Sequence, residues 1–149
     1  MSLKDLTLED LAIGQVFESS SVMVTAEDIM RFAGEFDPQP FHTDPEAAKG
    51  LFFGGLVASG WHTAALTMRL LAGSLPLAGG LIGAGIDELR WPRPTYPGDV
   101  LRVRSEVIEL RPSKSRPDRG MGKARCTTFN QRGEDVQILV PNLVLMRRV

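Results

Sequence analysis

The sequence predicts an α+β fold in which an antiparallel sheet wraps around one long helix. Helical segments with polar caps lie in the first third of the chain. Residues 60–72 form a helix that is apolar on most of its circumference, as buried helices are. Four strand-like segments with short connections follow. Because 149 residues suffice for one core but not for two, we expect a single domain over residues 1–149.

The first elements are an extended segment and a capped helix. Residues 15–24 predict a strand. Thr25 is placed to cap the helix that follows, which has acidic residues in its first turn. Val24 and Ile29 have the spacing of a hydrophobic staple. Apolar side chains then recur at helical spacing, at Ile29, Phe32, Ala33 and Phe36.

Two further helices are predicted before the strands. Asp44 caps a short helix whose first position is Pro45. Three glycines between residues 50 and 55 indicate a loop. Ser59 is the expected N-cap of the main helix, residues 60–72. One apolar stripe consists of Trp61, Ala64, Ala65, Met68, Leu71 and Ala72, and Leu66 and Leu70 add apolar surface on another side, so we expect the helix to be buried.

Four strands are predicted after residue 80, at residues 81–91, 100–110, 123–129 and 136–146. In the second of these, apolar and charged side chains alternate. Residues 130–133, Asn-Gln-Arg-Gly, predict a hairpin turn. Pro141 cannot donate a ladder hydrogen bond, so we expect a bulge or an edge position within the last strand.

The segment Phe36-Asp37-Pro38-Gln39-Pro40-Phe41-His42 gives the clearest indication of chemistry. An Asp/His pair can perform general acid–base catalysis near neutral pH. Each proline favours extended backbone in the residue before it. A fully extended segment would hold the two Cα atoms roughly 15 Å apart. The catalytic interpretation therefore requires a bend, whereas the alternative is an ordinary Asp-Pro turn with a structural histidine.

The same residues carry a resemblance to a known family. Asp37-Pro38-Gln39-Pro40-Phe41-His42 resembles the Asp-x-Asn-Pro-x-His signature of the MaoC-like dehydratases, which include the R-specific enoyl-CoA hydratases. The match holds at Asp37, Pro40 and His42, and it departs at Gln39, where the family usually has Asn. The resemblance implies the hot-dog fold, an antiparallel sheet around a central helix.

The resemblance also implies a reaction, the reversible addition of water to a 2-enoyl-CoA thioester. Asp37 and His42 would hold and activate the water, with syn addition. Gly60, at the start of the main helix, would offer its N–H to the thioester carbonyl, because helix N-termini have free donors and a positive dipole end. Ser59 belongs to the same expected thioester-binding group. No metal and no cofactor is needed, since coenzyme A enters as part of the substrate.

Basic residues in the second half suggest where coenzyme A would bind. Residues 111–120 form a basic loop, in which Lys114 and Arg116 are candidates for the phosphates; a solvated hairpin loop is the alternative. Gln39 and Arg93 are further candidates for substrate contact, the latter in a turn-rich connection over residues 90–99. We expect His62 to be a hydrogen-bonded core or interface histidine; the alternative is that it joins the site, since it lies within one turn of the helix start. Metal binding by His42, His62 and an Asp is not favoured, because no recognised metal-ligand spacing is present.

Composition excludes several other classes. Net charge is −1, which argues against general nucleic-acid binding. Residues 1–75 carry a net −6 and residues 76–149 a net +5, which leaves room for a small anionic ligand. No apolar run is long enough to span a membrane, and the acidic residues 1–10 do not resemble a signal peptide. Cys126 is the only cysteine, so we expect a reducing, cytoplasmic compartment.

Two alternative functions fit the same sequence, and a homodimer is also expected. A hot-dog thioesterase would direct a water at the carbonyl carbon and release a thiol. A non-catalytic acyl-thioester-binding module would bind without turnover. The resemblance implies a homodimer with the site near the subunit interface, and twofold dimers are the commonest oligomers.

Overall fold

The computed structural model describes residues 6–148. The first half of the acidic segment 1–10, which was not expected to be a signal peptide, therefore lies outside the described residues. A 3₁₀ turn at Leu8–Asp10 comes before the regular elements. The helices are α1 (Ala26–Phe36), α2 (Pro40–Thr43), α3 (Pro45–Ala48) and α4 (Gly60–Ser74). The strands are β1 (Val16–Glu18), β2 (Val22–Met23), β3 (Ile82–Arg90), β4 (Val100–Pro112), β5 (Arg119–Phe129) and β6 (Asp135–Met146).

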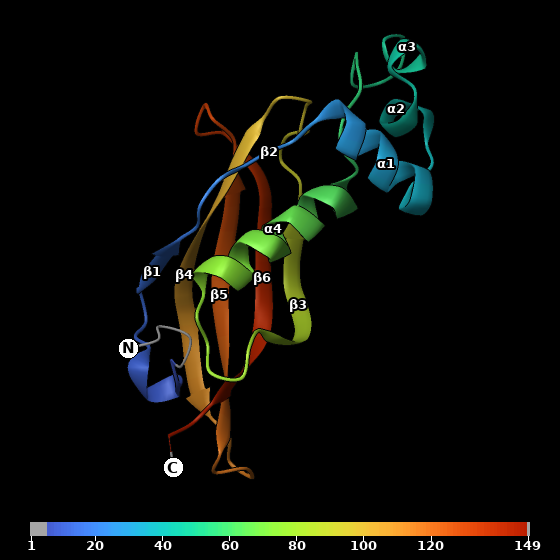
Figure 1. Ribbon diagram of the computed structural model, residues 1–149. Coiled ribbons are helices and arrows are strands. Elements are labelled where there is room, and N and C mark those ends of the chain that lie inside the picture. The colour runs from blue at the N-terminus through green and yellow to red at the C-terminus, as the bar shows by residue number, and fades with distance from the viewer. Residues whose placement is uncertain (1–5, 149) are drawn as a thin grey trace.

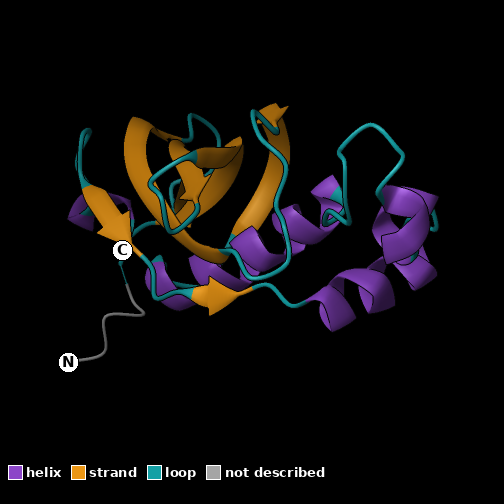
Figure 2. Ribbon diagram, turned by 90° about the horizontal axis from the view of Figure 1, so that it is seen from above, coloured by secondary structure: helices purple, strands orange, loops and turns teal. Residues whose placement is uncertain are grey.

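The strands form one antiparallel sheet in the order β1-β4-β5-β6-β3, with β2 also paired to β4. Helix α4 lies across one face of the sheet, and α1, α2 and α3 gather beyond one end of it (Figure 1). Seen from above, the sheet curves over the helix (Figure 2). This is the predicted hot-dog arrangement, and it places the first turn of α4 beside the three short helices.

The core between α4 and the sheet is apolar along the C-terminal half of the helix. Leu70 and Leu71 pack against buried side chains of β4, β5 and β6. Those strand residues are Val103, Ala124, Cys126 and Leu139. Burial of a leucine side chain is worth about 1.5–3 kcal/mol, so these contacts fix the helix on the sheet.

The three predicted helix caps are confirmed. Asp44 Oδ1 accepts from the N–H groups of Glu46 at 3.1 Å and Ala47 at 3.2 Å. The Thr25 hydroxyl accepts from the Asp28 N–H at 3.1 Å, and Ser59 Oγ accepts from the Trp61 N–H at 3.2 Å. Helix α4 extends two residues beyond the prediction, to Ser74. Strand β5 begins four residues earlier than predicted.

The prediction of one strand over residues 15–24 is wrong, because the structure divides it into β1 and β2. The break falls in a run of three serines. Ser19 N–H donates to the Val103 carbonyl at 3.0 Å, and Ser19 Oγ accepts from the Val103 N–H at 2.8 Å. A side-chain oxygen thus replaces a backbone ladder partner, as serine side chains are able to do.

The predicted buried stripe of α4 is also wrong for most of its members. Trp61 is 59% exposed and Met68 is 44% exposed, whereas His62, Thr63 and Thr67 face inward. Hydrogen bonds set this rotation: Thr63 Oγ1 donates to Thr95 Oγ1 at 3.2 Å, and Thr67 pairs with the sheet as described below. The apolar stripe therefore faces outward within one chain.

Pro141 lies in β6, an inner strand, so the edge alternative is excluded. It pairs with Ile86 of β3, and the β3–β6 register shifts on both sides of this pair. The irregularity thus falls in the neighbouring strand. Within residues 6–148 no strand pairs with the outer side of β3, which is an edge of the sheet.

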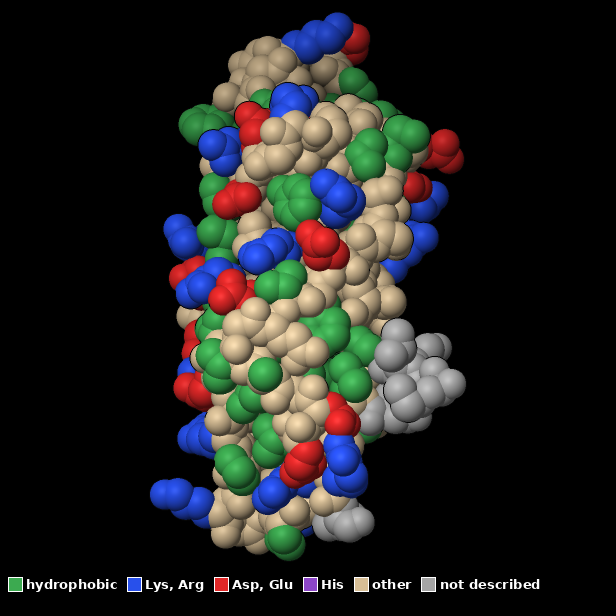
Figure 3. Space-filling model, turned by 90° about the vertical axis from the view of Figure 1, so that its left-hand side faces the viewer, with side chains coloured by type: hydrophobic (Ala, Val, Ile, Leu, Met, Phe, Trp, Pro, Cys, Tyr) green, Lys and Arg blue, Asp and Glu red, His purple; other side chains and the backbone are tan. Residues whose placement is uncertain are grey.

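The charges of the two halves of the sequence are mixed in space. Basic and acidic side chains alternate over the face shown in Figure 3. Arg147 Nε lies 2.9 Å from Glu9 Oε2, and Arg148 pairs with Asp10. Acidic residues of the N-terminal half are thereby partly neutralised by the basic C-terminal half. In the described part of the chain, no helix has the length and hydropathy needed to cross a bilayer.

Candidate active site

The segment from Asp37 to His42 bends, as the catalytic interpretation requires. Asp37 is the C-cap of α1, Gln39 is extended, and Pro40 opens α2. The His42 N–H donates to the Gln39 carbonyl at 2.9 Å, which closes the turn. As a result, His42 Nε2 lies 3.3 Å from Asp37 Oδ2.

Three neighbours fix the Asp37 carboxylate. Ser59 Oγ donates to Oδ2 at 2.7 Å, Gln39 Nε2 donates to Oδ1 at 2.5 Å, and the His42 ring stands beside Oδ2. Burial raises the pKa of Asp37, but the two hydrogen bonds and His42 more than offset it, so the pKa lies below its ordinary value. The carboxylate therefore stays ionised at neutral pH.

The His42 ring is held in one tautomer. It is 5% exposed, and its Nδ1 lies 2.7 Å from the Val57 carbonyl oxygen. A carbonyl only accepts, so Nδ1 carries a proton, and Nε2 is the ring nitrogen that faces Asp37. Because Nε2 and Asp37 Oδ2 are neighbours, both groups can bind the same water molecule from the side.

The start of α4 stands next to this pair. Gly60 is the first residue of the helix, and its N–H makes no hydrogen bond to any other residue within 6–148. The free N–H follows from its position, because the first four N–H groups of a helix have no intrahelical partner. The helix dipole adds a partial positive charge at the same point.

A pocket of about 370 Å³ lies between His42 and the start of α4. His42 and Gly60 lie on its wall with the connection that follows β3. The remaining lining is mostly aromatic and apolar; it consists of Phe41, Phe52, Phe53, Val57, Ala58, Thr63, Trp91, Pro92, Arg93, Pro94 and Thr95. Residues 91–95 of the predicted turn-rich connection thus line this pocket, and their contact with substrate stays a prediction.

The other predicted binding residues are divided between two ends of the molecule. Arg93 lines the pocket and donates to the Asp135 carbonyl at 3.3 Å. Lys114 and Arg116 belong to the turn between β4 and β5, which lies at the end of the sheet away from α2 (Figure 1). Within one chain they cannot contact a ligand held by His42, because the length of the sheet separates them. Within one chain, the structure therefore separates these two residues from the site.

Ser59 and Gln39 donate hydrogen bonds to the Asp37 carboxylate, and neither lines the pocket. Ser59 is fully buried, and its hydroxyl is engaged by Asp37 and by the Trp61 N–H. Direct contact of this hydroxyl with a thioester, as expected above, is thus replaced by a positioning contact. Gln39 is exposed and bonded to Asp37 Oδ1.

His62 is a core histidine, as predicted, but it is not hydrogen-bonded at Nδ1 to any residue in 6–148. Its ring stacks on Phe32 with centroids 4.7 Å apart. Burial lowers the pKa of His62 below 6.5. No group of three or more His, Cys, Asp or Glu side chains in this part of the chain could hold a metal ion.

Sequence reasoning missed a buried polar network next to the site. Trp91 Nε1 donates to Gln137 Oε1 at 2.9 Å, and Gln137 Nε2 donates to Thr67 Oγ1 at 3.0 Å. Thr67 Oγ1 and Thr128 Oγ1 are 2.6 Å apart. The one signal in the sequence was a pair of threonines in an otherwise apolar helix, which is too common to be interpreted alone.

Comparison with known proteins agrees with this geometry. Residues 9–126 match the family model described as "MaoC like domain". The crystal structure of the MaoC-like dehydratase from Rhodospirillum rubrum is 58% identical and superposes with a TM-score of 0.93, covering 97% of this chain and 99% of that one.

Two curated proteins extend the comparison. The uncharacterized protein YdeM of Bacillus subtilis is 35% identical over 145 residues, which cover 96% of this chain and all of YdeM. The 3-hydroxybutyryl-CoA dehydratase of Methylorubrum extorquens is 31% identical over 115 residues, covering 76% of this chain and 71% of that protein. With a family model matched over most of its length, this chain belongs to the MaoC-like domain family.

Proposed function

We propose that the protein is an acyl-CoA hydratase or dehydratase that adds water reversibly to a 2-enoyl-CoA thioester. The observation that carries the proposal is the 3.3 Å approach of His42 Nε2 to Asp37 Oδ2, since His42 and Gly60 line the same pocket. A related protein is named 3-hydroxybutyryl-CoA dehydratase, and the family shared with it supports this class of reaction.

In the proposed reaction, Asp37 and His42 bind one and the same water molecule. Asp37, whose pKa is lowered, remains a carboxylate and orients the water. His42 Nε2 takes a proton from the water as its oxygen bonds to C3, and the C2=C3 electron pair moves toward the carbonyl. The imidazolium then gives the proton to C2 on the same face. Each positioned proton-transfer group contributes about 10²–10⁴-fold in rate.

The negative charge that develops on the thioester oxygen needs a donor. The Gly60 N–H is free and lies at the positive end of α4. A donor of this kind contributes about 10²–10³-fold in rate. Arg93 at the pocket wall is the basic side chain placed to meet the phosphates of coenzyme A, which enters as part of the substrate.

We also propose that the protein acts as a homodimer. The outer edge of β3 exposes Ile82 and Ile86. The neighbouring stripe of α4 exposes Trp61 and Met68, although the sequence predicts it to be buried. An unpaired edge strand beside an exposed apolar stripe fits a second copy of the chain.

The test is loss of enoyl-thioester absorbance with a series of 2-enoyl-CoA substrates, with free thiol measured in parallel. Asp37→Asn and His42→Ala are each expected to lower kcat/KM by about 10²–10⁴-fold. Asp118→Asn, an exposed carboxylate at the start of β5, is the matched control and should retain the wild-type rate.

Each outcome selects one function. Hydration that collapses in both site variants, without thiol release, supports the hydratase. Release of coenzyme A thiol by the wild type would instead assign a thioesterase. Binding of enoyl-CoA without turnover, and with unchanged affinity in Asp37→Asn, would assign a non-catalytic binding module.

A further inference from the structure

A second pocket lies along the same helix as the site, and the two do not meet. The site pocket takes Gly60 and Thr63 from α4. The second pocket takes Met68, Leu71 and Leu75 from the same helix. Thr67 lies between these two sets in the sequence, lines neither pocket and is fully buried.

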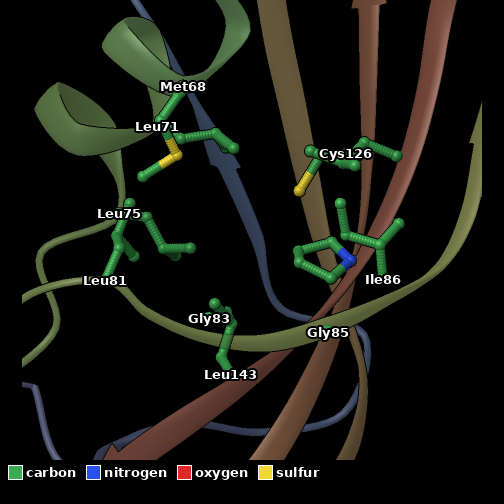
Figure 4. A pocket seen from close by; sticks show the side chains of 11 residues that line it. Met68, Leu71, Leu75, Leu81, Gly83, Gly85, Ile86, Cys126 and Leu143 are labelled. Carbon is green, nitrogen blue, oxygen red and sulfur yellow. The ribbon is translucent and has the colours of Figure 1, made fainter. Parts of the chain in front are cut away.

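The second pocket has a volume of about 330 Å³ and an apolar wall. Its side chains come from α4, from β3 and its preceding loop, and from β5 and β6, and they point into a common space (Figure 4). They are Met68, Leu71, Leu75, Leu81, Ile86, Cys126, Leu139, Pro141 and Leu143, with Gly83 and Gly85. Since one water occupies about 30 Å³ of liquid, the space is large enough for several methylene groups.

A hydrogen-bonded barrier stands between the two pockets. It consists of Trp91, Gln137, Thr67 and Thr128, joined by contacts of 2.9, 3.0 and 2.6 Å. Gln137, Thr67 and Thr128 are fully buried. In β6, Gln137 precedes the residues that line the apolar pocket, and Trp91 follows the part of β3 that lines it.

Of the four residues in this network, Trp91 is the one that lines the site pocket. A Cβ atom placed on Gly60 would lie 2.7 Å from Trp91 Cε2 and 2.8 Å from Cζ2, so the ring is in contact with the Gly60 backbone. The ring nitrogen is fixed by Gln137, which has no freedom to move because its own amide is bonded to Thr67. An acyl chain starting at Gly60 therefore meets the Trp91 ring before it reaches the apolar pocket.

We propose that Trp91 determines chain length and restricts the enzyme to short 2-enoyl thioesters, with Gln137 as the residue that positions its ring. This inference rests on the proposed function and adds the substrate class. Removal of the ring enlarges the site pocket on the side that faces the apolar pocket, so that longer chains can enter. Each further methylene that becomes buried is expected to raise kcat/KM by roughly fourfold.

The experiment measures kcat/KM of the full-length protein with but-2-enoyl-CoA and oct-2-enoyl-CoA. The wild type should prefer the shorter substrate. In Trp91→Ala the octenoyl-to-butenoyl ratio should rise by about tenfold or more, since two buried methylenes suffice for that change. Trp91→Leu, which retains apolar volume, gives a smaller rise and serves if the alanine variant is unstable.

Two further variants separate a positioning role from a structural one. Asp118→Asn, the exposed carboxylate already used as a control, lines neither pocket and should leave the ratio unchanged. Gln137→Met should raise the ratio in the wild-type background but not in Trp91→Ala, because its effect passes through the ring. A merely structural Gln137 would alter stability in both backgrounds without this dependence.

The outcomes are distinguishable. If the wild type hydrates both substrates equally, or if the ratio is unchanged in both Trp91 variants, the chain-length role is refuted while the hydratase assignment stands. If the wild type hydrates neither these nor other chain lengths, the proposed function is refuted and the chain-length role with it.

Discussion

Replacement of Ser59 by alanine removes the Oγ atom, which makes two hydrogen bonds. Ser59 Oγ donates to Asp37 Oδ2 at 2.7 Å and accepts from the Trp61 N–H at 3.2 Å. Loss of a serine N-cap costs about 1 kcal/mol, and loss of a hydrogen bond to a charged group costs about 1.5–3 kcal/mol. We therefore expect the free energy of unfolding to fall by about 2.5–4 kcal/mol, or Tm by roughly 5–15 °C.

The same change should affect catalysis through Asp37. Without the Ser59 donor the pKa of Asp37 rises, because a hydrogen bond to its charged form is lost. The acidic limb of the kcat/KM profile should then move to higher pH. Misplacement of the carboxylate should lower kcat/KM for an enoyl thioester by about 100-fold.

The assay combines urea unfolding followed by circular dichroism with initial rates across pH. Ser74→Ala is the matched control, since Ser74 Oγ bonds only the Leu70 carbonyl, at 2.8 Å in the last turn of the same helix. If Ser59→Ala and Ser74→Ala lose equal stability, or if the acidic limb does not move, the assigned role of Ser59 is wrong.

Three further predictions concern stability. Gly60→Ala should lower the free energy of unfolding by about 1–3 kcal/mol, and Tm with it, because the new Cβ would lie 2.7 Å from the Trp91 ring. An unchanged Tm would contradict that contact. Burial lowers the pKa of His62, so the unfolded chain binds its proton more readily and stability falls as pH drops below 6.5. His62→Leu should weaken this dependence in urea unfolding at about pH 5 and about pH 7.5. The Arg148 N–H and the Arg147 side chain lower the pKa of Glu9 to about 2, so its contribution is present above 4.5 and lost as pH falls toward 2. Acid unfolding of Glu9→Gln should show a shallower slope across that interval, and an unaltered slope would exclude the pairing.

Features that depend on a few neighbouring residues were predictable from the sequence. The caps at Thr25 and Ser59 form as expected, because a hydroxyl reaches an N–H only two or three residues ahead. The hairpin turn over residues 130–133 forms as well, with the Gly133 N–H bonded to the Asn130 carbonyl at 3.0 Å. The chain-reversing bend at Pro38 and Pro40 was only a requirement, yet it occurs within the same short range.

The rotation of α4 was not predictable in this way. Periodicity assigned Trp61 and Met68 to the core, but both are exposed within one chain. The buried face instead includes Thr63 and Thr67, whose partners Thr95 and Thr128 are 32 and 61 residues away. Hydrophobic periodicity identifies a helix with apolar faces but does not say which face meets the sheet.

The sequence alone thus determined the fold class, the boundaries of α1 and α4 to within a few residues, and the pair Asp37 and His42 in one short segment, whereas helix α2 was not predicted. The tertiary structure decided that Ser59 bonds Asp37, that Gln137 fixes Trp91 over Gly60, and that the β4–β5 turn lies far from the site. The physical reason is range: caps and turns depend on contacts three or four residues apart, whereas these pairings depend on how distant elements pack and which buried polar groups are left to satisfy.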